Sequence, residues 1–260
     1  MSYSALILAR SGPVASITLN RPDVHNAFDE SFIAELTACF TTLSNNDAVR
    51  AIVITGAGDS FCAGADIAWM KRMAAFSRRE NLDDARRLQQ MLIAIYESPK
   101  ATIARVNGAA IGGGAGLAAA CDLAISSDTA AFAFSEVRLG IAPAVIAPYV
   151  LQKIGVGAAR AKFVTGERFS AQEALRIGLV DRVVPQSELD EAVSQVTDSI
   201  LRCGPAAIAA TKLLLRQIAG KAPAECGQTT VEVIADLRTS DEGQEGIRAF
   251  LEKRKPNFAE

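Results

Sequence analysis

The chain has 260 residues and a mass of 27.4 kDa, which fits one large domain or one domain with a smaller appendage. Half of the residues are apolar, and 27 Lys and Arg against 29 Asp and Glu leave a formal net charge of −2. This balance excludes the strongly basic surface typical of nucleic-acid binding, so we expect no nucleic-acid partner. No apolar run reaches the roughly 18 residues that a membrane span requires, so no membrane association is expected.

The five cysteines are odd in number and widely spaced, at positions 39, 62, 121, 203 and 226. We interpret them as reduced packing residues of a cytoplasmic protein, and not as a disulfide framework or a metal site. The N-terminal residues show no basic flank before an apolar segment, so no secretion signal is predicted. With His25 as the single histidine, we expect neither Ser-His-Asp catalysis nor a His-rich metal site.

Short apolar runs that end at turn residues predict the strands of the first half. Residues 14–19 form such a run between Gly12-Pro13 and Asn20-Arg21-Pro22. Asp29 can then cap a helix, because the apolar residues that follow repeat at helical spacing (Phe32, Leu36, Phe40 and Leu43).

The middle of the chain predicts a layered α/β structure. Residues 51–55, 101–106 and 122–126 are runs without polar alternation, which is typical of strands buried on both faces. A helix-like segment, 112–121, separates the last two of these strands. Strand, helix and strand at this spacing imply crossover connections and a largely parallel sheet.

The last hundred residues are predicted to be mostly helical. Ser170 and Glu173 form a capping box, and Gly178 stands where that helix would end. Another helix is predicted to open at Ser187-x-x-Asp190, and further helices at 205–220 and 241–254. These segments are amphipathic, so they must cover the sheet or a neighbouring subunit.

Two stretches combine small residues with a position directly after a strand. At residues 60–67, the small side chains of 62–65 would let a ligand approach the main chain, although a tight turn explains them equally well. In the second stretch, 107–117, three adjacent glycines open a helix and leave its first N–H groups uncovered, as an anion or a polarised carbonyl requires. Close helix–strand packing is the alternative. The spacing matches neither a dinucleotide fingerprint nor a P-loop.

Glu136 is a lone carboxylate in the apolar stretch 131–143. A buried carboxylate has a raised pKa and can exchange protons near neutral pH. The alternative is that Glu136 points outward or pairs with Arg138.

Several motifs follow one another along nearly the whole chain, at 19–27, 61–67, 107–114, 121–122, 134–140, 165–171 and 241–258. Together they resemble the crotonase (enoyl-CoA hydratase/isomerase) family. The resemblance implies an α/β fold in which a spiral of ββα units, 1–195, precedes a C-terminal helical region, 196–260, that mediates trimer formation. Family trimers often pair as a dimer of trimers. An acyl-CoA thioester substrate is implied too, with no separate cofactor, because coenzyme A is part of that substrate.

The resemblance also assigns roles to main-chain groups. The N–H groups of Ala65 and Gly113 would hold the thioester oxygen, where negative charge develops in an enolate-like state, and one such donor contributes on the order of 3 kcal/mol. Ala63, Asp66 and Ile67 would line the path of the pantetheine. The full implied set of substrate-binding residues is Ala27, Ala63, Asp66, Ile67 and Gly112.

The sequence departs from the family where hydratases carry two glutamates. One of these activates water and the other delivers a proton to the α-carbon. Glu136 occupies the place of the second, whereas Gly116 stands at the place of the first. A site with one glutamate is also what Δ3,Δ2-enoyl-CoA isomerases use.

The segment 141–149 departs as well, because the family usually has a Pro-Gly-rich turn there. With Gly116, this segment resembles bacterial hydratases of branched glutaconyl-CoA esters, which act in leucine and acyclic terpene breakdown. Three functions therefore stay open: such a hydratase, an isomerase, and a catalytically silent protein that binds acyl-CoA.

Overall fold

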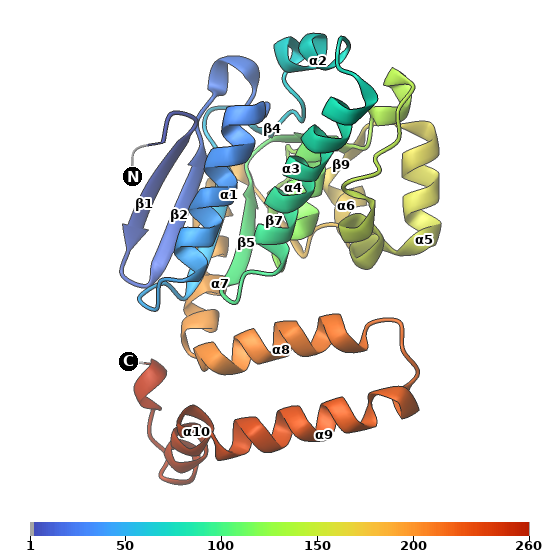
Figure 1. Cartoon of the computed structure of the whole chain (residues 1–260). Helices are drawn as coiled ribbons and strands as arrows, with labels where there is room; N and C mark the ends of the chain where they lie inside the picture. Colours follow the sequence, from blue (N-terminus) through green and yellow to red (C-terminus); the bar gives the residue numbers. More distant parts are fainter. Residues whose placement is uncertain (1–2, 260) are drawn as a thin grey trace.

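The computed structural model describes residues 3–259 and contains two β-sheets with helices packed around them (Figure 1). The strands are β1 (Leu6–Ser11), β2 (Val14–Leu19), β3 (Ala51–Gly56), β4 (Ser60–Cys62), β5 (Ala101–Val106), β6 (Ala109–Ile111), β7 (Leu123–Ser127), β8 (Ala131–Ala133), β9 (Phe169–Ser170) and β10 (Arg182–Val184). The α-helices are α1 (Glu30–Ser44), α2 (Ile67–Met73), α3 (Arg78–Tyr96), α4 (Gly113–Ala120), α5 (Ala147–Thr165), α6 (Ala171–Arg176), α7 (Leu189–Leu201), α8 (Pro205–Ile218), α9 (Pro223–Thr239) and α10 (Asp241–Leu251). Four short 3₁₀ turns complete the described part: η1 (Pro22–Val24), η2 (Glu136–Leu139), η3 (Gln186–Glu188) and η4 (Asn257–Ala259).

The larger sheet has the strand order β1-β2-β3-β5-β7-β10, and the smaller one has the order β4-β6-β8-β9. Every pair in the larger sheet is parallel except the β1–β2 hairpin, which confirms the prediction of a largely parallel sheet. The β4–β6 and β6–β8 pairs are parallel too. The strand pairs β3–β4, β5–β6 and β7–β8 each add one strand to each sheet before a helix follows, which is the spiral of ββα units that the resemblance implied.

Alternate side chains of the central strands enter two separate cores. Ile52 and Ile54 of β3 face the larger core with α1, α3 and α4, whereas Val53 faces a smaller core with Leu189 and Val193 of α7. Helices therefore cover both faces of the sheet, which explains why these strands show no polar alternation.

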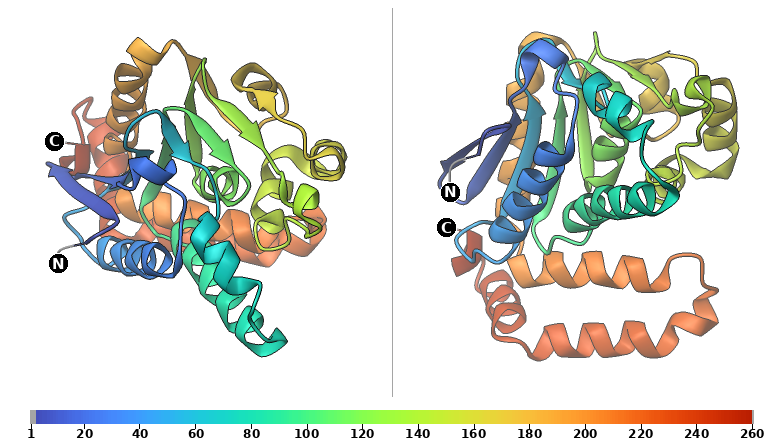
Figure 2. Two further views of the ribbon diagram at one scale, coloured as in Figure 1. Left: turned by 90° about the horizontal axis from the view of Figure 1, so that it is seen from above. Right: turned by 45° about the horizontal axis from the view of Figure 1, so that its top comes forward.

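The C-terminal helices lie apart from the sheets. Figures 1 and 2 show α8 and α9 as an antiparallel pair beyond one end of the core, with α10 across their end. Helix α7 spans the predicted boundary at residue 195, and the helices that stand apart begin with α8. Large apolar side chains stay exposed on these helices: Leu213, Leu215, Val231, Ile234, Ile247, Phe250 and Leu251.

Two details of helix capping differ from the prediction. Ser187 does not open α7, because residues 186–188 form a 3₁₀ turn and no side chain caps the helix. Ser170 does accept a hydrogen bond from the N–H of Glu173, but the Glu173 side chain binds Arg176 and leaves the capping box half formed. Within the described residues, no helix combines the length and the apolar character needed to cross a lipid bilayer.

Candidate active site

A cavity of about 300 Å³ lies where the two predicted small-residue stretches meet. Its walls come from the loop before α2, from α2 and α3, from the start of α4, and from the segment that runs from Ser135 to Ile146. Most of the lining side chains are apolar. The lining includes Phe28, Ala63, Ala65, Trp69, Asp84, Gly112, Gly113, Glu136 and Ile146. A mostly apolar cavity with a few polar groups is typical of a small-molecule site.

The main-chain N–H groups of Ala65 and Gly113 are both available at this cavity. The N–H of Phe28 donates to the oxygen of Gly64 (2.8 Å), and the N–H of Asp66 donates to the oxygen of Phe28 (3.0 Å). Because Ala65 lies between these two bonds, its own N–H points to the opposite side. Gly113 is the first residue of α4, where a helix leaves its N–H without an internal partner. No described residue accepts a hydrogen bond from either group.

Close packing fixes these two segments against each other. Gly64 has a φ of +87°, and a methyl group on it would lie 2.8 Å from the oxygen of Ile111 and 3.6 Å from the nitrogen of Gly113. A methyl group on Gly113 would lie 2.3 Å from Cζ of Phe28. The packing interpretation of the glycines is therefore confirmed, and close packing also brings the two amides together; the ligand interpretation stays a prediction.

Glu136 is the first residue of η2, directly after β8 and Ser135. Its side chain is largely buried and lines the cavity, and Oε2 has no hydrogen-bond partner. A methyl group on Gly112 would lie 3.0 Å from Oε1, so the carboxyl group stands beside the start of α4. Burial raises the pKa of Glu136 above its ordinary value. In the described part of the chain, Glu136 forms no ion pair with Arg138, and its carboxyl group lines the cavity. Both alternatives, an outward-facing side chain and a pair with Arg138, are therefore wrong.

Position 116 is closed to any side chain. Gly116 is buried in α4, and a methyl group there would lie 2.2 Å from Cγ2 of Ile146. Ile146 is itself buried and lines the cavity. An isoleucine therefore fills the volume beside the position where family hydratases carry their other glutamate.

The remaining predicted substrate-binding residues divide into two groups. Ala63 and Gly112 line the cavity with Ala65 and Gly113, whereas Ala27, Asp66 and Ile67 are not among the lining residues. Ile67 is 73% exposed at the start of α2, and Ala27 is buried. Their predicted contacts with the pantetheine or the acyl group stay predictions.

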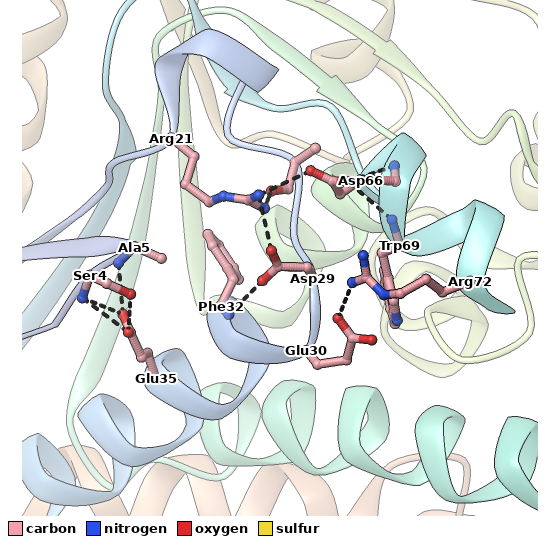
Figure 3. Close-up of polar contacts among 12 residues, drawn as sticks. Ser4, Ala5, Arg21, Asp29, Glu30, Phe32, Glu35, Asp66, Trp69 and Arg72 are labelled. Carbon is pink, nitrogen blue, oxygen red and sulfur yellow. Dashed lines mark hydrogen bonds and ion pairs between the residues drawn. The ribbon is translucent and has the colours of Figure 1, made fainter.

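Asp66 has a clear structural task (Figure 3). Its carboxylate accepts hydrogen bonds from the N–H groups of Ala68 and Trp69 at the start of α2, and it pairs with Arg21 at 3.0 Å. Arg21 also pairs with Asp29 at 3.0 Å, so one guanidinium group connects the first turns of α1 and α2. Burial alone would raise the pKa of Asp66, but these hydrogen bonds and the Arg21 charge outweigh it and lower the pKa.

We expect Asp66→Ala to lower the free energy of unfolding by about 1–2 kcal/mol, because α2 loses its N-terminal cap. Thermal unfolding measures this loss, with Asp23→Ala on the exposed η1 turn as the control. A large rise in KM for an acyl-CoA without a loss of stability would instead favour the predicted pantetheine contact.

Three further residues have defined surroundings. His25 Nδ1 lies 3.1 Å from Oγ of Ser60, and no triad forms, because no hydrogen bond or ion pair joins its ring to a carboxylate within residues 3–259. Cys62 is buried, which raises its pKa to about 12, so it is a packing residue and not a nucleophile. Trp69 lines the cavity although it is only 2% exposed, so it belongs both to the pocket wall and to the core.

The sequence interpretation did not single out Asp84 of α3, which also lines the cavity. A signal was present, because Asp84 stands on the face of the helix that carries Leu88, Met91 and Ile95 at helical spacing. A carboxylate in such a row is buried with its apolar neighbours, and Asp84 is indeed 5% exposed.

Comparison with known proteins agrees with this geometry. The family model described as enoyl-CoA hydratase/isomerase matches residues 9–260. A crotonyl-CoA hydratase of Syntrophomonas wolfei is 37% identical over 270 residues, covering 99% of each chain. Among solved structures, an enoyl-CoA hydratase/isomerase of Marinobacter aquaeolei is 40% identical with a TM-score of 0.92, and covers 98% of this chain and 99% of that one. Pseudomonas aeruginosa AtuE is 36% identical with a TM-score of 0.95, over 99% and 100% of the two chains. The chain therefore belongs to the enoyl-CoA hydratase/isomerase family.

Proposed function

We propose that this enzyme is a hydro-lyase that adds water across the 2,3-double bond of an enoyl-CoA thioester. The observation that carries the proposal is the meeting of three groups in one cavity: the N–H of Ala65, the N–H of Gly113 and the buried carboxyl group of Glu136. The relatives named as enoyl-CoA hydratases support the same reaction class.

The reaction needs one base that becomes an acid. With the thioester oxygen on the two amides, ionised Glu136 takes a proton from water, and the hydroxide bonds to C3. The electron pair of the double bond moves toward the thioester oxygen, where the fixed amides stabilise the enolate better than water that must reorient. Protonated Glu136 then returns its proton to C2, so the carboxylate is regenerated and one water has been added.

For the acyl group we propose a branched glutaconyl-CoA ester. The support is the absence of a carboxylate at Gly116 and the apolar wall that the segment from Ile141 to Ile146 gives to the cavity.

The competing function is a Δ3,Δ2-enoyl-CoA isomerase, favoured by the same single carboxylate. A panel of crotonyl-, 3-methylglutaconyl-, 3-enoyl- and saturated CoA esters in ¹⁸O-labelled water separates the two. Hydration predicts loss of the enoyl-thioester absorbance and incorporation of ¹⁸O at C3. Conversion of the 3-enoyl ester without ¹⁸O would identify an isomerase, and binding without turnover on the whole panel would identify a silent protein.

The raised pKa of Glu136 predicts how kcat/KM for hydration depends on pH. Because the group acts first as a base, kcat/KM is lost as pH falls through its pKa. We expect the acidic limb of the profile to lie above pH 4.5, the ordinary value of a glutamate, because burial disfavours the ionised form. The measurement is kcat/KM for hydration between pH 4 and 8. A limb at or below the ordinary value would contradict the assignment.

We also propose that the enzyme forms a homotrimer or a dimer of trimers through its C-terminal helices. The support is their row of exposed apolar side chains, which a partner subunit would cover. Sedimentation of the intact chain tests this assembly.

A further inference from the structure

A second polar corner lies in the same cavity, on the side formed by α2 and α3. Asp84 and Trp69 both line the cavity although they are only 5% and 2% exposed. Among the described residues that line it, Glu136 and Asp84 are the two with ionisable carboxyl groups. The proposed hydration uses only Glu136, so the buried carboxyl group of Asp84 has no part in it.

The polar atoms of this corner are incompletely satisfied. Nε1 of Trp69 is buried and has no hydrogen-bond partner of normal distance and angle, although a weaker contact with the Asp84 carboxyl group lowers the pKa of that group. Asp84 has one ion pair, to Nη2 of Arg87 one turn along α3, at the long distance of 3.4 Å. Because buried polar groups are nearly always paired, an unpartnered indole N–H beside a cavity indicates a missing ligand group.

The position of this corner relative to the thioester site follows from Phe28. Its ring lies against Gly113 and also makes an edge contact with Trp69, with ring centroids 5.8 Å apart. With the thioester oxygen held at Gly113, the corner lies one aromatic ring farther along the cavity. Acyl atoms beyond C3 would reach it.

We propose that Asp84 and the indole N–H of Trp69 bind a carboxyl group carried by the acyl chain, with one proton shared between that group and Asp84. This inference rests on the proposed function and specifies how the distal end of its substrate is recognised. Trp69 donates to one carboxylate oxygen and protonated Asp84 to the other. Two carboxyl groups in one buried site hold a proton between them, because both cannot ionise side by side.

The charges around Asp84 are consistent with this arrangement. Arg87 supplies one positive charge from α3, and Glu30 of α1, which pairs with Arg72 of α2 at 2.6 Å, supplies a negative one. Burial, the largest effect, raises the pKa of Asp84 against the opposing effects of Arg87 and of the Trp69 indole. Of the residues that line the cavity in the described chain, none is a lysine or an arginine, so a bound carboxylate needs a proton as its counter-charge.

The test compares 3-methylglutaconyl-CoA with its uncharged analogue 3-methylcrotonyl-CoA between pH 6 and 8.5. For the wild type we expect KM of the carboxylated ester to rise with pH, approaching tenfold per unit where one full proton is taken up on binding. KM of the neutral ester should stay constant.

In Asp84→Asn the side-chain amide can donate a hydrogen bond at any pH without first taking up a proton. KM of the carboxylated ester should therefore lose its pH dependence. Trp69→Phe should raise that KM about tenfold at every pH, by more than it raises KM of the neutral ester.

Asp83→Asn provides a matched control on the adjacent residue. Asp83 makes the same pair with an arginine one turn along, Arg86 at 2.6 Å, but its side chain is 48% exposed. This variant should keep the wild-type KM and pH profile. The inference is overturned if both esters show the same pH dependence, if Asp84→Asn weakens binding and keeps the pH dependence, or if an ester with a terminal hydroxyl binds better than the carboxylated one.

Failure of this inference is distinguishable from failure of the proposed function. Trp69 is the single tryptophan of the chain, so its fluorescence reports ligand binding directly at the corner. Binding of both esters can therefore be titrated in Glu136→Gln, in which turnover during the titration is expected to be strongly reduced. A pH-dependent Kd for the carboxylated ester would support the subsite even if the wild type catalyses isomerisation, and a pH-independent Kd would refute it even if hydration is found.

Discussion

Replacing Glu136 by Gln is expected to lower kcat for hydration by about 100- to 10,000-fold, the range for loss of a general acid–base group. Glutamine keeps the size of the side chain and can still occupy the space beside Gly112, but it cannot take a proton from water. KM should change little, because Ala65 and Gly113 hold the thioester oxygen through their main chains. Steady-state kinetics on the best ester of the panel measures both constants.

The stability of the same variant separates lost chemistry from lost structure. Since burial raises the pKa of Glu136, the folded state binds this proton more tightly than the unfolded state. The resulting stabilisation is present at low pH and is lost as pH rises through the folded pKa. At neutral pH the uncharged glutamine should therefore raise the melting temperature. Glu188→Gln on the exposed η3 turn should change neither activity nor stability. Unchanged hydration in Glu136→Gln would refute the catalytic assignment.

Gly116→Glu is expected to cost more than about 3 kcal/mol of folding stability, and not to create a hydratase with two carboxylates. The new Cβ would lie 2.2 Å from Cγ2 and 2.7 Å from Cβ of Ile146, so neither side chain has room. The glutamate would also bring an unpaired charge into α4, whose residues are almost all buried. Thermal and denaturant unfolding measure the loss.

The double variant Gly116→Glu/Ile146→Gly tests whether the side chain of Ile146 alone excludes a glutamate from position 116. Removing both Ile146 atoms that clash should restore part of the lost stability, since residue 146 is the N-cap of α5 and glycine is accepted at such positions. The carboxylate would then face the cavity, and hydration of unbranched crotonyl-CoA should exceed that of the control Ile146→Gly. A single variant as stable as the wild type would show that position 116 is open after all.

The periodic parts of this fold could be predicted from its sequence. Helix α1 begins after Asp29, which accepts from the N–H of Phe32 as predicted, and α4 covers the predicted glycine-rich helix. Strands buried on both faces, such as β3, carry a strong apolar signal. Helix α9 was not predicted as a separate element, because its residues are mostly exposed and polar and its apolar positions face outward.

The site was only partly predictable, for a physical reason. The resemblance identified Ala65, Gly113 and Glu136, and the structure places all three at one cavity. Asp84 and Ile146 were missed, because each acquires its place through contacts across the fold. Ile146 precedes α5 but fills the space beside Gly116 of α4. Asp84 of α3 meets Trp69 of α2. Helical spacing indicates that Asp84 is buried, but it does not show which residue of another element each side chain meets.

The close contact between α4 and β4 has a consequence for how this enzyme can diversify. A methyl group on Gly114 would lie 2.0 Å from the oxygen of Cys62, so helix and strand touch backbone to backbone beside the two amide donors. Larger side chains on that half of the cavity would therefore separate the helix from the strand and displace the amide donors. New acyl specificities must therefore arise on the opposite wall, from α2, α3 and the segment that ends at Ile146. Libraries built for altered substrate range should be confined to that wall.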